Sequence, residues 1–171
     1  MNLAENRQRK RIRLGDYDYS QNGVYFITIC THNRELLFGN VGADSISALM
    51  ITDIFNETIN QYPNVHCPSY VIMPNHIHAV IVIENEMQQV RADMESAPTA
   101  SLSDIVQSFK RHTTIEYIKM VKQGVLKPFN GKVWQRSFYD HVVRNYDDFL
   151  DICKYIDDNP RKWKEDELYR Q

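Results

Sequence analysis

The order of its segments predicts an α+β fold of the ferredoxin-like (RRM-like) type, with helices packed on a mostly antiparallel sheet of four to five strands. Strand-like and helix-like patterns alternate in the order β-α-β-β-α-β-α, and the two middle strands are separated only by the turn signal Pro74-Asn75. A chain of 171 residues that is 43% hydrophobic also has the size of one domain, expected to span residues 1–171.

The first part of the chain predicts a basic arm, a strand and a helix. Residues 1–20 form the arm. Residues 24–31 are rich in β-branched and aromatic side chains, which favours a strand. Ser45 belongs to a residue type that caps helices, and it precedes apolar side chains at helical spacing. These apolar positions are Ile51, Phe55 and Ile59.

The central part predicts an antiparallel hairpin followed by a surface loop. Residues 70–73 and 76–83 are strand-like, and the Pro-Asn pair between them is typical of a short turn. Residues 84–100 are polar and acidic and include a proline. This composition predicts an acidic surface loop within the domain.

A long helix is predicted after the loop. Ser101 and Ser103 are both suitable N-terminal caps, and Gly124 is a typical C-terminal signal. Between them, one stripe of the helix carries the side chains expected to face the core. This stripe consists of Leu102, Ile105, Val106, Phe109, Thr113, Tyr117 and Met120.

An extended segment and a second helix follow. Residues 133–143 contain aromatic and β-branched side chains, which favours an extended conformation. The helix begins near Asn145 or Asp147, and Asn159-Pro160 stops it. Its apolar positions follow the spacing i, i+3, i+4, i+7 and are Phe149, Ile152, Cys153 and Ile156.

The composition argues against membrane and disulfide-stabilised classes of protein. The apolar runs are too short to span a bilayer, and none follows the first basic residues as in a secretion signal. The three cysteines form no CxxC pair. We therefore expect a cytoplasmic protein with no membrane partner.

Charge is distributed unevenly, although the formal net charge is only −2 at pH 7. Basic residues gather in the arm and again from the long helix onward, whereas acidic residues gather between 84 and 95 and after 147. Such blocks suit a polyanionic partner, and they are also typical of solvated surfaces.

Two histidines are candidate metal ligands. His76 and His78 are two positions apart on a predicted strand, so both imidazoles point to the same face. Neighbouring imidazoles on a rigid strand can occupy adjacent coordination positions. The same pattern also occurs where histidines face solvent or pair with carboxylates.

A second candidate pair lies on the last helix. Tyr155 and Asn159 are one turn apart and share a flank of that helix. A phenol is a weak nucleophile at neutral pH unless a base or cation assists it, and an amide oxygen is a possible ligand for that cation. Alternatively, the tyrosine packs at the boundary of the helix and Asn159 only ends it.

These residues belong to a longer pattern that resembles the single-tyrosine HUH endonucleases, namely the REP-associated tyrosine transposases and the insertion-sequence transposases that act on single strands. The resemblance covers residues 9 to 163 and is centred on Met73-Pro74-Asn75-His76-Ile77-His78, the HUH motif. The other matching segments are Arg11-Ile12-Arg13-Leu14, Tyr17-Asp18-Tyr19, residues 25–33, Ser101-Leu102, Ser108-Phe109-Lys110, Val133-Trp134-Gln135, Tyr139-Asp140-His141, Arg144-Asn145, Tyr155-Ile156 and Asn159-Pro160.

The resemblance implies a site and a reaction. His76, His78 and Asn159 correspond to the ligands of a divalent metal ion, Mg²⁺ or Mn²⁺, and Tyr155 corresponds to the nucleophile. The implied function is that of a transposase-like endonuclease and strand transferase, which cleaves single-stranded DNA near hairpins through a covalent 5′-phosphotyrosine intermediate.

The implied partner is single-stranded DNA with a hairpin or palindromic element. Members of the family act as dimers or, in the REP-associated branch, as monomers, so a monomer is slightly favoured here over a homodimer. Basic side chains would neutralise the DNA backbone. The expected DNA-binding residues are Arg9, Lys10, Arg11, Arg13, Lys110, Arg111, Arg136 and Arg144.

Two other functions are compatible with the sequence. One is a non-catalytic module of the same fold that binds single-stranded nucleic acid. The other is a small hydrolase that uses only the two histidines and a metal, in which Tyr155 is dispensable. No GxSxG, P-loop or GxGxxG motif indicates a further class of enzyme.

Overall fold

The computed structural model describes residues 17–40, 45–84 and 101–170, which contain the predicted succession of elements. Most of the predicted arm and loop, residues 1–16 and 85–100, lies outside these described residues. The strands and helices are β1 (Gly23–Cys30), α1 (Ile46–Asn60), β2 (Val65–Met73), β3 (His76–Ile83), α2 (Leu102–Lys122), β4 (Tyr139–Val143) and α3 (Tyr146–Asp158). Two short 3-10 turns, η1 (His32–Arg34) and η2 (Trp163–Glu165), complete them.

The four strands form one sheet in the order β2-β3-β1-β4, and every neighbouring pair is antiparallel. This order places β3 between β1 and β2, as in the split β-α-β arrangement of the ferredoxin-like fold. The α+β prediction with four strands is therefore confirmed. None of the described helices is long and apolar enough to span a bilayer.

The predicted cap residues begin all three helices. The side chain of Ser45 accepts a hydrogen bond from the Ala48 backbone at the start of α1. Ser101, rather than Ser103, caps α2, and Asn145 caps α3 in the same way. Each cap satisfies a backbone N–H that has no partner within its helix.

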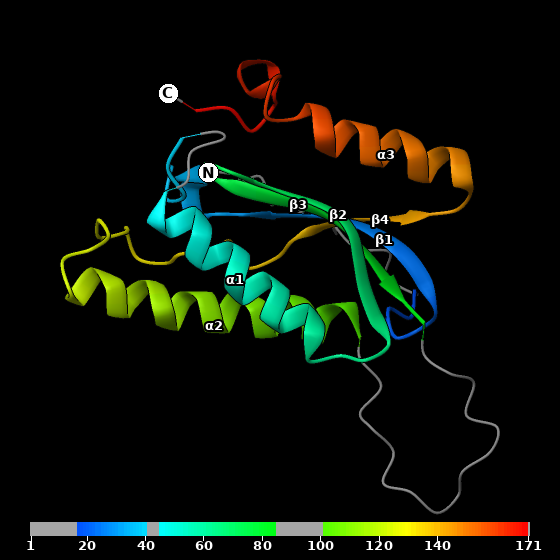
Figure 1. Cartoon of the computed structure of the whole chain (residues 1–171), viewed down its shortest axis with the longest axis horizontal. Coiled ribbons are helices and arrows are strands. Elements are labelled where there is room, and N and C mark those ends of the chain that lie inside the picture. Colours follow the sequence, from blue (N-terminus) through cyan, green and yellow to red (C-terminus); the bar gives the residue numbers. More distant parts are fainter. Residues whose placement is uncertain (1–16, 41–44, 85–100, 171) are drawn as a thin grey trace, which may run out of the picture.

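The two faces of the sheet differ in chemistry. Figure 1 shows α1 and α2 covering one face and α3 crossing the other. Alternate side chains of β3 follow this division: Ile77, Ala79 and Ile81 are fully buried in the core with α1 and α2. His76 and His78 therefore point to the α3 face. The apolar core thus holds in place a strand whose other side carries the candidate ligands.

Two strand boundaries differ from the sequence prediction. β2 begins at Val65 rather than at residue 70, since it is an edge strand that tolerates Pro68 at a shift of register between His66 and Ser69. β4 covers only the end of the predicted segment 133–143. Its earlier part pairs only in the single bridge between Thr31 and Trp134.

Candidate active site

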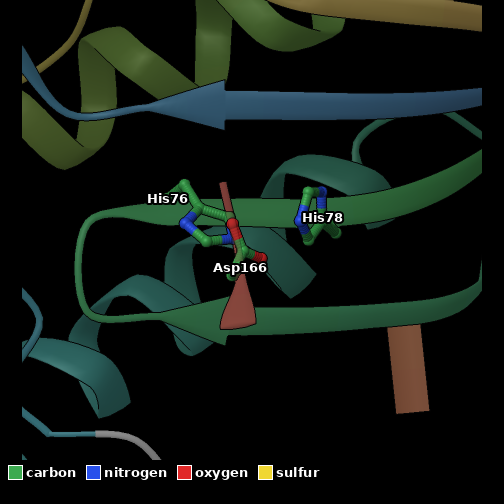
Figure 2. Close-up of side chains that lie close together, drawn as sticks. All are labelled: His76, His78 and Asp166. Atoms are coloured by element: carbon green, nitrogen blue, oxygen red, sulfur yellow. The ribbon is translucent and has the colours of Figure 1, made fainter. Parts of the chain in front are cut away.

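His76 and His78 lie side by side at the start of β3. Their side chains are buried, with exposed fractions of 0% and 3%, and their ring centroids are 4.5 Å apart. Figure 2 shows both imidazoles leaving the strand on the side from which Asp166 approaches. The prediction that the two histidines share a face is therefore correct, and the alternative of solvent-facing histidines is wrong.

A hydrogen bond at Nδ1 orients each imidazole. Nδ1 of His76 lies 2.8 Å from the side-chain oxygen of Asn75, and Nδ1 of His78 lies 2.8 Å from the hydroxyl of Thr28. Both rings therefore turn Nε2 toward the space beneath α3. This arrangement is common around metal-binding histidines, where the second ring nitrogen is held by a neighbouring polar group.

Burial keeps both imidazoles neutral. It lowers the pKa of His76 to about 2, with additional effects of the nearby His78 and Arg34. It lowers the pKa of His78 to about 4, a shift that the negative charge of Asp166 partly opposes. Only a neutral imidazole has a free lone pair for a metal. Both side chains are thus ready to bind a cation at physiological pH.

Asp166 is a third potential ligand, which the sequence patterns did not reveal. It directly follows η2, and its carboxylate oxygen Oδ2 lies 3.9 Å from Nε2 of His76. One ligand atom from each of His76, His78 and Asp166 can be chosen so that all lie within 4.8 Å of one another. The Asp166 side chain is only 5% exposed. No periodic pattern distinguishes it from the other acidic residues after α3.

Asn159, the predicted third ligand, adjoins this group. It follows the last residue of α3, is 4% exposed, and donates a hydrogen bond of 3.0 Å from Nδ2 to Oδ2 of Asp166. This contact orients the carboxylate toward the histidines. It also leaves the amide oxygen Oδ1 of Asn159 available.

The site has the properties expected of a cation-binding site. Nε2 of His76 and Oδ1 of Asn159 are buried, and neither has a hydrogen-bond partner in the described part of the chain. Buried polar atoms without partners are uncommon and need an explanation. Two imidazole nitrogens, a carboxylate and an amide oxygen form a donor set that suits a divalent cation. The residues present therefore fit the ion that the family resemblance implies.

Tyr155 reaches this group from α3. Its phenolic oxygen lies 3.3 Å from Nε2 of His78, and its ring contacts the edge of Phe26. The side chain is 46% exposed, so one side of it is open to solvent. Burial of the rest raises the pKa of Tyr155, and the charge of Asp166 raises it further, whereas the nearby Asn159 amide opposes the rise. A cation beside Asp166 would lower this pKa again.

Of the predicted DNA-binding residues, the structure describes four, which come from α2 and from the two ends of β4. Arg9, Lys10, Arg11 and Arg13 lie outside the described residues. Lys110 and Arg111 belong to α2, on the face of the sheet opposite to Tyr155. The ammonium group of Lys110 donates to the carbonyls of Gln135 and Ser137 and lies 5.9 Å from the ring centroid of Phe138. Arg136 and Arg144 flank β4 and are exposed.

Comparison with known proteins relates most of the chain to transposases. Residues 20–159 match the family model described as IS200-like transposase. An uncharacterised protein of Haemophilus influenzae is 33% identical over 173 residues, which cover 94% of this chain and 93% of that protein. A second protein of the same organism, provisionally named a REP-associated tyrosine transposase, is 26% identical and covers 85% of this chain and 74% of its own length.

Two solved structures share the fold at low sequence identity. A REP-associated tyrosine transposase bound to a REP hairpin has a TM-score of 0.59 at 18% identity, over 88% of this chain and 74% of that one. A crystal structure from Deinococcus radiodurans, provisionally named a transposase, has a TM-score of 0.50 at 16% identity, over 85% of this chain and 95% of that one. The fold of this chain is therefore one that occurs in these two structures.

Proposed function

Because this chain belongs to the family of IS200-like transposases, we propose that it cleaves and rejoins single-stranded DNA near hairpins through a covalent link between Tyr155 and a 5′-phosphate. The observation that carries this proposal is the position of the Tyr155 hydroxyl, 3.3 Å from a histidine of the candidate metal site. A nucleophile and a cation site are thus brought together from two elements distant in sequence.

The ligand set extends the one implied by the resemblance. His76, His78 and Asp166 would hold the ion, with Asn159 supplying an amide oxygen. Bound there, a divalent ion would polarise the scissile phosphate and stabilise the charge of the transition state. The fixed rotamers of the two histidines limit the reorganisation that binding requires, because Thr28 and Asn75 already hold their outer nitrogens.

Tyr155 performs the covalent step. Its phenolic oxygen attacks the phosphorus and forms the new P–O bond, while the bond from phosphorus to the 3′-oxygen breaks. The phenolic proton leaves to solvent on the exposed side of the ring, and the departing 3′-oxygen takes up a proton. The reverse reaction, attack of a 3′-hydroxyl on the phosphotyrosine, rejoins two strands without hydrolysis.

A hairpin-bearing strand is the substrate that the comparisons favour. The structural relative with a TM-score of 0.59 was solved with a REP hairpin. In this chain, Arg136 and Arg144 are exposed beside β4 and offer positive charge to the DNA backbone. We assign the basic residues of the arm to the same role.

The contact between Tyr155 and His78 supports a site built within one chain. Tyr155 and His78 lie within hydrogen-bond reach of each other in a single copy, so a neighbouring subunit is not needed to supply the nucleophile. This arrangement supports a monomer that acts in cis. The alternative, a non-catalytic binding module, leaves the unpaired buried atoms of His76 and Asn159 unexplained.

Adduct formation tests the proposal. The protein is incubated with hairpin-bearing single-stranded DNA and Mn²⁺ and then separated under denaturing conditions. We expect a covalent adduct that disappears with a chelator and in Tyr155→Phe. The control Tyr146→Phe changes an exposed tyrosine at the first position of the same helix and should leave the adduct intact. An adduct of normal yield in Tyr155→Phe would show that the nucleophile is wrongly assigned.

A further inference from the structure

Asn75, in the turn between β2 and β3, makes an unusual number of side-chain contacts for a turn residue. It is fully buried, and both ends of its amide are used. Oδ1 lies 2.8 Å from Nδ1 of His76, while Nδ2 donates to the carbonyls of Leu168, at 2.8 Å, and Arg34, at 3.3 Å. A residue that only formed a turn would not need side-chain hydrogen bonds to its neighbour His76 and to two distant segments of the chain.

The two carbonyl contacts determine which way the amide faces. A carbonyl oxygen only accepts hydrogen bonds, so the side-chain atom that faces Leu168 and Arg34 must be the NH₂ group. Oδ1 therefore faces His76 and can only accept. Consequently His76 carries its proton on Nδ1, and the lone pair of Nε2 is directed toward Asp166. The tautomer of a candidate metal ligand is thus set by Asn75.

The same amide holds the segment that carries Asp166. Leu168 is two residues beyond Asp166, and its carbonyl is bound directly by Asn75. A second contact reinforces this position, since the guanidinium of Arg34 donates to the carbonyl of Glu167 at 3.1 Å.

The backbone around Arg34, which accepts a hydrogen bond from Asn75, has an uncommon conformation. Asn33 and Arg34 have φ angles of 53° and 56°, in the left-handed region that residues other than glycine rarely adopt. Arg34 in this conformation presents its carbonyl to Asn75 and its side chain to Glu167. Such strain persists only where surrounding contacts over-determine it, and it is concentrated at functional sites.

We infer that Asn75 is a positioning residue that couples the two parts of the metal site, selecting the tautomer of His76 through Oδ1 and docking the Asp166 segment through Nδ2. This role rests on the proposed function, because it assumes that the site binds a cation. Asn75 acts through His76, because its Oδ1 bonds to Nδ1 and leaves Nε2 free of it.

Two substitutions separate the two halves of this role. Asn75→Asp keeps an acceptor for His76 but removes the donor for Leu168 and Arg34. Asn75→Leu, similar in size, removes both. Asn56→Asp, an exposed position on α1, makes the same chemical change far from the site and is the matched control.

The first measurement is the ¹⁵N shifts of the His76 ring in metal-free protein without DNA, at pH 7.5. We expect the Nδ1–H tautomer in the wild type, in Asn75→Asp and in the control, and a mixture of tautomers in Asn75→Leu. The second is hydrogen exchange of residues 163–170, which should accelerate in both Asn75 variants but not in the control. Mn²⁺ affinity should then fall by about ten- to a hundredfold in both.

The possible outcomes are distinct. An unchanged His76 tautomer in Asn75→Leu, or unchanged exchange in Asn75→Asp, would overturn the inference. If Asn75→Leu does not fold, hydrogen exchange in Asn75→Asp decides: faster exchange of residues 163–170 supports the inference, and unchanged exchange rejects it. Neither measurement requires catalysis. If the wild type forms no covalent adduct with DNA, the proposed function is rejected, but the tautomer and exchange measurements still test the role of Asn75.

Discussion

The phenolic oxygen of Tyr155 lies 3.3 Å from Nε2 of His78, although 77 positions separate the two residues in the chain. The contact spans two layers, because His78 belongs to the sheet and Tyr155 to the helix that crosses it (Figure 1). Because of this contact, the candidate nucleophile Tyr155 lies next to the potential cation ligands His76, His78 and Asp166.

Thr28→Val tests whether the hydrogen bond to His78 matters for metal binding. The substitution preserves shape but removes the hydroxyl 2.8 Å from Nδ1, so the imidazole loses its orientation. We expect Mn²⁺ affinity, measured by calorimetry, to fall by about ten- to a hundredfold. Thr113→Val is the control, since Thr113 is also buried but accepts a hydrogen bond from Trp134 on the opposite side of the sheet. A metal affinity reduced equally in both variants would mean that the effect is only structural.

Asp166→Asn tests the ligand that lies outside the family pattern. The amide keeps the size of the side chain but removes its negative charge, which divalent ions prefer among oxygen ligands. Mn²⁺ affinity is expected to drop by more than tenfold, without loss of thermal stability comparable to a core substitution. Glu167→Gln removes a neighbouring exposed charge and should change the affinity little. Equal affinities of Asp166→Asn and wild type would exclude Asp166 as a ligand.

Much of this site is predictable because strand and helix periods constrain side-chain direction. Alternation along β3 predicts that His76 and His78 share a face, and helical spacing predicts that Tyr155 and Asn159 share a flank. Neither period gives the distance between the strand and the helix. That distance depends on how α3 returns across β2 and β3 after β4, which is a property of packing between distant segments.

Asp166 and Asn75 show where sequence patterns fail. Asp166 follows a proline and an irregular turn, so no periodicity relates it to the histidines. Asn75 matches the pattern of an ordinary turn, and two of its three side-chain contacts are with residues far away in the sequence, Arg34 and Leu168. Lys110 is a different case. Its place in a basic stretch predicts a DNA contact, whereas in the structure its ammonium group donates hydrogen bonds to two backbone carbonyls.

The metal-free protein should lose stability as the pH falls from 7 to 5. Burial lowers the pKa values of His76 and His78 to about 2 and 4 from the ordinary value of 6.5, so in this range the unfolded chain binds protons that the folded protein does not. The expected loss approaches about 1.4 kcal/mol per pH unit for each histidine below pH 6.5. Chemical unfolding in the presence of a chelator measures it. His78→Gln should reduce the slope, and stability that rose on acidification would contradict the burial of neutral imidazoles.

Lys110→Met and Arg144→Ala should separate a structural cation from one that binds DNA. Lys110 donates to Gln135 and Ser137 in the segment before β4, so its loss leaves two carbonyls without this donor and is expected to lower the melting temperature. Arg144 is exposed, and its loss should leave stability almost unchanged while weakening DNA binding and reducing its dependence on salt. Fluorescence anisotropy at several salt concentrations, with thermal unfolding alongside, measures both effects. If Lys110→Met weakened DNA binding without lowering the melting temperature, and Arg144→Ala did the reverse, Lys110 would be the DNA contact.

The proposed reaction requires that Tyr155 itself becomes linked to DNA. The most direct measurement is mass spectrometry of the protein after reaction with hairpin-bearing single-stranded DNA and Mn²⁺, followed by nuclease and protease digestion. We expect a peptide containing Tyr155 that carries a 5′-linked nucleotide, and no such peptide when the chelator is present. A nucleotide attached to Tyr139, Tyr146 or another residue, or cleavage of the DNA without any linked peptide, would contradict it.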